Sequence, residues 1–163
     1  DGTGIDTADM STFTNFEKLT IANNASTGSI VINTLTVADG STLIVNSSAI
    51  TTASNTFTLD ASAETDGGLV VTGSAGIDTI SMTQSDIADA LSLAGANDII
   101  NVAGGQLTSA DSINAGDGTD TLSYSSDEAI VLADFTNVLN LEKLTSANSV
   151  QITGNLGGLA AAA

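Results

Sequence analysis

A short apolar motif recurs along the second half of the chain with a nearly constant spacing. Five apolar segments start 22, 22, 17 and 20 residues apart, at residues 69–73, 91–95, 113–116, 130–134 and 150–154. One unit of this size cannot bury its own apolar face, so neighbouring units must stack into a solenoid. Their first residues, Leu69, Leu91, Ile113 and Ile130, are expected to form one apolar ladder along the core.

The residues between the turns favour strands over helices. Runs rich in Val, Ile and Thr alternate with clusters of Gly, Asp, Asn and Ser, which is the pattern of strands and turns. We expect strands over residues 29–37, 42–46, 56–60, 69–72, 79–82, 98–102, 121–124, 129–132 and 150–153. Residues 84–93 also fit a helical turn, and we interpret them as strand or loop.

Short, regularly spaced strands also occur in β-sandwiches, but the internal repeat favours stacked coils. The expected fold is therefore all-β: a parallel β-helix or β-roll-like solenoid with coils of about 20 residues. We expect residues 1–163 to form a single solenoid region, which is a fragment of a longer, repeat-bearing secreted protein.

A longer duplication supports this modular organisation. The sequence Glu17-Lys18-Leu19-Thr20 returns as Glu142-Lys143-Leu144-Thr145, after related Phe-Thr-Asn segments. The two lysines of the chain therefore occupy equivalent places in the two copies. We expect each Glu–Lys pair to lie at a corner or on the surface, where such an ion pair contributes about 0–1 kcal/mol.

The charge balance restricts the partners. Asp and Glu total 19 against two basic residues, and the net charge is −17. This surface repels phosphate, which argues against nucleic-acid binding and against anionic membranes. No apolar run reaches the length of a membrane span. Hard cations such as calcium take carboxylate and carbonyl oxygen ligands, although the acidity could equally serve solubility alone.

The inventory of reactive side chains argues against an enzyme. Cysteine and histidine are absent, which removes thiolate chemistry and Ser-His-Asp or Cys-His arrangements. Paired carboxylates can hydrolyse glycosides, and such pairs are Asp127 with Glu128, Asp86 with Asp89, and Glu64 with Asp66. In so acidic a chain these pairs arise by chance, and the chain has no tryptophan to form a sugar platform.

Glycine and aspartate gather in the turns. The segment Gly116-Asp117-Gly118-Thr119-Asp120-Thr121-Leu122 resembles the G-G-x-G-x-D-x-U-x repeat of the RTX (repeats-in-toxin) proteins, with Ala115 at the first glycine position. Residues 73–80 are a second match, in which Ser74 replaces a glycine. Weaker copies begin at residues 2 and 95.

The resemblance implies calcium at these turns, where aspartates of one turn and carbonyls of the next share each ion. The implied ligands are the carboxylates of Asp78, Asp98 and Asp120, the weaker candidate Asp6, and the carbonyls of Gly73, Gly76, Gly116 and Gly118, with Asp117 and Asn97 as neighbours. Glycine permits the positive φ that turns carbonyls toward a cation. Alternatively, these aspartates only hydrogen-bond their own turns. The coils are also longer than the family's two nonapeptides, which favours some turns without an ion.

The sparse glycine–aspartate turns between Thr/Ser/Val strands also resemble bacterial surface-layer proteins with RTX-like regions. That resemblance implies a secreted, structural protein of the cell surface that self-associates into a lattice or filament. Cell-surface polysaccharide is a further expected partner. The alternatives are a segment of an RTX-type adhesin or type I-secreted effector, and a fragment of a β-helical carbohydrate-active enzyme.

Overall fold

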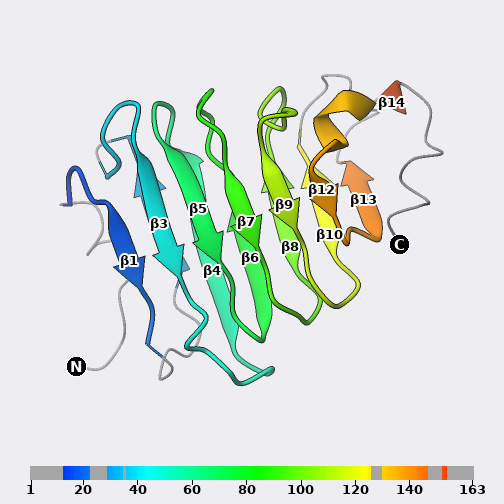
Figure 1. Ribbon diagram of the computed structural model, residues 1–163, viewed down its shortest axis with the longest axis horizontal. Helices are drawn as coiled ribbons and strands as arrows, with labels where there is room; N and C mark the ends of the chain where they lie inside the picture. Colours follow the sequence, from blue (N-terminus) through cyan, green and yellow to red (C-terminus); the bar gives the residue numbers. More distant parts are fainter. Residues whose placement is uncertain (1–12, 23–28, 35, 126–129, 147–151, 154–163) are drawn as a thin grey trace.

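The chain is a two-sheet β-solenoid. The computed structural model describes residues 13–22, 29–34, 36–125, 130–146 and 152–153. About five coils follow one another roughly 22 residues apart, as the repeat predicted. Successive strands alternate between two facing six-stranded sheets, so each coil contributes a strand to both (Figure 1). All of the strand pairs in these sheets are parallel.

The strands of each sheet lie in the order of the coils. The first sheet contains β1 (Lys18–Thr20), β3 (Thr42–Asn46), β5 (Gly68–Thr72), β7 (Ala90–Ser92), β9 (Ser112–Asn114) and β12 (Val138–Leu139). The second contains β2 (Ser29–Asn33), β4 (Thr56–Ala63), β6 (Ile77–Ser81), β8 (Ile99–Val102), β10 (Thr121–Tyr124) and β13 (Lys143–Ser146). The short strands β11 (Ile130–Val131) and β14 (Ile152–Thr153) pair separately, and the 3-10 helix η1 (Leu132–Phe135) follows β11.

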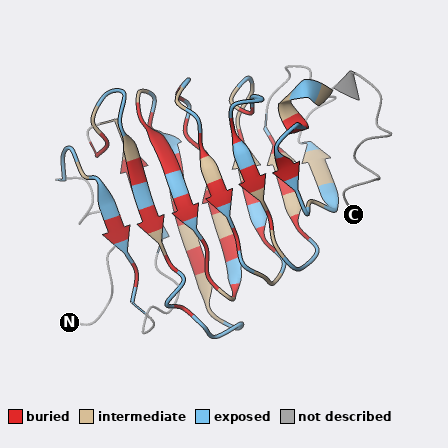
Figure 2. Ribbon diagram, in the orientation of Figure 1, coloured by how far each residue is buried: buried red, intermediate tan, exposed pale blue. Residues whose placement is uncertain are grey.

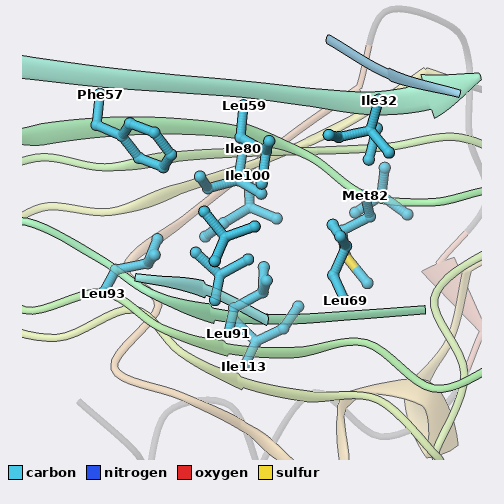
Figure 3. Close-up of a cluster of buried hydrophobic side chains, with 14 of the residues drawn as sticks. Ile32, Phe57, Leu59, Leu69, Ile80, Met82, Leu91, Leu93, Ile100 and Ile113 are labelled. Atoms are coloured by element: carbon cyan, nitrogen blue, oxygen red, sulfur yellow. The ribbon is translucent and has the colours of Figure 1, made fainter. Parts of the chain in front are cut away.

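The core lies between the sheets and is almost entirely aliphatic. Burial alternates along strands such as β3 and β6, because successive side chains of a pleated strand point to opposite faces (Figure 2). In-register inward positions of the second sheet form the apolar ladder Leu59, Ile80, Ile100 and Leu122, all fully buried. Figure 3 shows Leu59, Ile80 and Ile100 pointing toward Leu91 and Ile113 of the first sheet. Stacking such rows removes from water the faces that a single coil would leave exposed.

The predicted ladder of the first sheet was wrong at both ends. Leu91 and Ile113 are neighbours in it, but the residue beside Leu91 is Val71 rather than Leu69. The residue beside Ile113 is Val138 rather than Ile130. The coil between β5 and β7 is two residues shorter than the next one, and β11 with η1 is inserted before β12. An alignment by first apolar residue cannot detect either change.

Two of the predicted strands have the bounds that the structure shows. Residues 42–46 and 121–124 are strands with the predicted bounds, and residues 84–93 contain β7. The strand predicted over residues 29–37 ends at Asn33, because a turn closes there: the Thr36 N–H donates to the Asn33 carbonyl at 2.8 Å. The predictions for residue 129 and for residues 150–151 lie outside the described residues.

The two copies of the Glu-Lys-Leu-Thr duplication share a local conformation but not a sheet. Asn15 and Asn140 both have positive φ, at 53° and 56°, just before the two copies. The first copy leads into β1 of the first sheet and the second into β13 of the second sheet. Lys18 and Lys143 are both exposed, as predicted. The duplication therefore marks a way of starting a strand, not a fixed place in the coil.

Candidate metal site

Acidic residues form a hydrogen-bonded column where the chain enters the second sheet. Asp78, Asp98, Asp120 and Glu142 stand at one register position, which Phe57 occupies one coil earlier. The N–H of Asp78 donates to Asp98 Oδ1 at 2.8 Å, and that of Asp98 donates to Asp120 Oδ1 at 2.7 Å. The N–H of Asp120 donates to Glu142 Oε2 at 2.8 Å. We call these four residues the second-sheet column.

A matching column lies where the chain enters the first sheet. The N–H of Leu69 donates to Asp89 Oδ1 at 2.8 Å, and the N–H of Asp89 donates to Asp111 Oδ1 at 2.8 Å. Asp89 and Asp111 form this first-sheet column. At both corners the carboxylate satisfies a buried backbone donor of the preceding coil, which would otherwise lack a partner.

The remaining oxygens of the first-sheet column have donors of their own. Asp89 Oδ2 accepts the Thr83 N–H at 3.0 Å, and the Thr83 hydroxyl is 3.2 Å from the same oxygen. Asp111 Oδ2 accepts the Thr108 N–H at 2.8 Å and the Thr108 hydroxyl at 3.2 Å. Each of these carboxylates is therefore fully hydrogen-bonded within the protein.

The second-sheet column differs at its two central residues. Asp98 and Asp120 are 0% exposed, and the Oδ2 atom of each is buried without a hydrogen-bond partner. Burying an ionised oxygen without hydrogen-bond donors destabilises the fold by roughly several kcal/mol, unless a proton or a cation neutralises the charge. A positive ligand at these two atoms would remove that cost.

The electrostatics of these two carboxyl groups favour a cation. Burial raises the pKa of Asp98 to about 7, and the negative charges of Asp78 and Asp120 add to the rise. Burial also raises the pKa of Asp120, with further repulsion from Glu142 and Asp117. Each charge that acts on this pair is thus another carboxylate, and a divalent ion would relieve the repulsion.

The turns around Asp98 and Asp120 stack directly on each other. Gly95 and Asp117 form a parallel bridge, and the Asp117 N–H donates to the Ala94 carbonyl at 3.3 Å. The Thr119 N–H donates to the Asn97 side-chain oxygen at 2.9 Å. The side chains of Asn97 and Asp117, the predicted neighbours of the ligands, are exposed.

Two glycines allow this close stacking. Gly116 has φ 100°, a conformation that side chains disfavour, and a Cβ there would collide with the Leu93 carbonyl oxygen. A Cβ on Gly118 would collide with the Ala96 carbonyl oxygen, and it would also lie 3.1 Å from Asp120 Oδ1. Carbonyl oxygens of one turn therefore crowd the glycines of the next, beside the Asp120 carboxylate.

The turn before Asp78 is closed by hydrogen bonds instead. Ser74 donates its N–H to Asp78 Oδ2 at 2.9 Å and its hydroxyl to Asp78 Oδ1 at 2.7 Å. The Gly76 carbonyl lies 3.2 Å from the same hydroxyl. Gly73 and Gly76 do not have positive φ; a Cβ on either would collide with the Asp78 carboxylate or the Asn55 carbonyl, respectively. This turn matches the hydrogen-bonded alternative, with Ser74 supplying the donors.

The structure thus links Asp78, Asp98 and Asp120, three of the predicted ligands, through hydrogen bonds from backbone N–H to carboxylate. Asp6 lies outside the described residues. Sequence reasoning missed Asp89, Asp111 and Glu142 as members of the columns. Asp89 and Asp111 are 22 residues apart, the same spacing as Asp98 and Asp120, and that spacing was the signal that could have found them.

The oxygen atoms at the central turns fit a hard cation. Across the described ranges, no three acidic side chains gather as a ready set of metal ligands. An ion at Asp98 and Asp120 would therefore be completed by backbone carbonyls and water, which calcium accepts readily with its six to eight oxygen ligands.

No protein-family model, curated protein or solved structure matches the chain. Among the described residues, no helix has the length and apolar character needed to cross a membrane.

Proposed function

We propose that this chain is a structural segment of a secreted bacterial surface-layer or matrix protein, whose solenoid is stabilised by calcium. The observation that carries the proposal is the pair of buried, unpartnered oxygens, Asp98 Oδ2 and Asp120 Oδ2. They lie in stacked glycine turns, among charges of their own sign. A fold that buries such atoms gains stability from a cation that binds there.

The choice of calcium follows from the ligand chemistry. Carboxylate and carbonyl oxygens are hard ligands, and the chain has no histidine or cysteine to select a softer metal. Calcium tolerates irregular coordination and water, whereas magnesium demands a near-ideal octahedron. Binding would couple folding to the extracellular calcium concentration, because an ion that binds only the folded state stabilises it.

The regularity of the molecule supports a structural role. Both sheets are parallel ladders that repeat with the coils, and the outward faces carry mainly small and polar residues between scattered aliphatic ones. Calcium would also reduce the −17 net charge that otherwise keeps copies apart. Self-association into a lattice or filament, in contact with cell-surface polysaccharide, fits these properties.

The test is to add calcium to the purified, chelated chain and to follow its state by light scattering and electron microscopy. We expect melting at higher temperature in calcium than in EDTA, followed by ordered sheets or filaments. A calcium-stabilised monomer that binds glycans would support an adhesin instead, and saccharide turnover would support an enzyme. An identical circular-dichroism spectrum and melting temperature with and without EDTA would contradict the calcium proposal.

A further inference from the structure

A second pair of carboxyl groups lies at the turn between β4 and β5, outside both columns. Glu64 is 0% exposed, which is unusual for a glutamate without a basic partner. Its Oε1 atom accepts three backbone N–H groups, from Thr65 at 3.0 Å, Asp66 at 3.1 Å and Gly67 at 3.0 Å. Successive amides of a turn that converge on one anionic oxygen hold the ionised form in place.

The other oxygen of Glu64 has no such donors. Glu64 Oε2 is buried without a hydrogen-bond partner, and so is Asp66 Oδ1. Burial raises the pKa of Glu64, and the Asp66 carboxyl group raises it further through a side-chain hydrogen bond and charge repulsion. Two adjacent carboxylates cannot both stay ionised at low cost unless they share a proton or bind a cation.

The surrounding structure fixes this turn. The Gln84 N–H donates to the Glu64 carbonyl at 2.7 Å, and the Gly40 N–H donates to the Asp66 carbonyl at 2.9 Å. A Cβ on Gly67 would lie 2.5 Å from the Val37 side chain, so this part of the turn is packed against the preceding coil. Asp66 is only partly buried, which leaves the pair a route to solvent.

We infer that Glu64 and Asp66 form a separate site for a hard divalent cation, calcium by its ligand chemistry, held by Glu64 Oε2 and Asp66 Oδ1. The amides that hold Glu64 Oε1 favour its ionised form against the effect of burial and leave its second oxygen for the ion. Water from the exposed side of Asp66 completes the coordination. This site lacks the glycine–aspartate motif and lies in the turn before β5, so it does not depend on an ion at Asp98 and Asp120.

The isosteric variant Glu64→Gln separates a cation from a shared proton. The glutamine oxygen can still accept the three amide N–H groups, and its NH2 group can donate to Asp66 Oδ1. We would count bound calcium by equilibrium dialysis at pH 7.5 for the wild-type chain, Glu64→Gln, Asp66→Asn and the exposed control Asp39→Asn. We expect both pair variants to bind one calcium fewer than the wild type, and Asp39→Asn to bind the wild-type number.

Equal calcium counts in the wild type and in both pair variants would overturn the inference. In that case a shared proton would explain the pair, and Glu64→Gln should raise the melting temperature equally in calcium and in EDTA. If Glu64→Gln fails to fold, Asp66→Asn decides, because its side chain is partly exposed and the amides on Glu64 remain. Failure of the proposed Asp98 and Asp120 site would instead appear as an unchanged calcium count in variants of those two residues.

Discussion

Asp89 and Asp98 occupy corresponding places at opposite corners of the solenoid. They differ in whether a residue with a hydroxyl side chain donates to the second carboxylate oxygen. Each accepts a backbone N–H of the preceding coil through Oδ1. Thr83 donates hydrogen bonds to the second oxygen of Asp89, whereas the second oxygen of Asp98 has no donor. In the glycine–aspartate turns the residue four positions before the aspartate is Ser74, Ala94 or Gly116. Only the serine can donate a hydroxyl, and its turn is the closed one.

The buried Asp89 carboxyl group should make the stability of the fold depend on pH. Burial raises its pKa to about 6, with Asp111 adding repulsion while the Thr83 and Leu69 amides oppose the rise. The folded state therefore binds this proton more tightly than the unfolded state does. The resulting stability is fully present below about pH 4 and is lost as pH rises through about 6. Two pKa units correspond to about 3 kcal/mol.

We expect the wild-type chain to lose about this much more unfolding free energy than Asp89→Asn between pH 4 and pH 7.5. Urea unfolding in EDTA at several pH values would measure the difference, and the exposed Asp86→Asn should keep the wild-type slope. Parallel pH profiles for the wild type and Asp89→Asn would show that Asp89 titrates normally.

At the scale of the element, neighbouring residues of β8 show how alternation sets stability. Ile100 is fully buried in the ladder between Ile80 and Leu122, whereas Ile99 is 38% exposed on the outer face. Removing a buried isoleucine leaves a cavity in a core that has few bulky side chains to move into it.

We expect Ile100→Ala to lower the free energy of unfolding by about 2–5 kcal/mol, and Ile99→Ala to lower it by about 1 kcal/mol or less. Denaturant unfolding of both variants, with the slope m checked for constancy, measures this directly. Similar losses in the two variants would mean that the register of β8 is wrong.

The elements also show what the sequence could and could not predict. β3 and β10 were predicted with their bounds, because short apolar or alternating runs bounded by Gly, Asp or Ser give a clear local strand signal. The three-residue strands β7 and β9 carry too little local signal; pairing with their neighbours defines them. Glu142 was predicted as a surface residue and is exposed, and its oxygen also accepts the Asp120 N–H. That contact depends on which coil stacks next to the coil of Asp120, and the sequence of a single repeat does not contain this information.

At the scale of the whole molecule, two rows of acids run along a solenoid whose net charge is already −17. Stacking places the acids of each column one coil apart, so the repulsion between them grows with each added coil. The first-sheet column limits this cost with threonine donors. The second-sheet column leaves two oxygens that a cation would neutralise, so in our proposal calcium takes part in the stacking of the coils.

The calcium proposal is tested by comparing the melting temperature of Asp98→Asn with that of the wild type, at pH 8, in EDTA and in saturating calcium. The asparagine side chain of this variant keeps the acceptor for the Asp78 N–H and removes the buried charge. We expect Asp98→Asn to melt at a higher temperature than the wild type in EDTA and at a lower one in calcium, where the wild type gains about 2.7 kcal/mol at a calcium concentration of one hundred times Kd. An equal calcium-induced rise in both proteins would contradict the proposal.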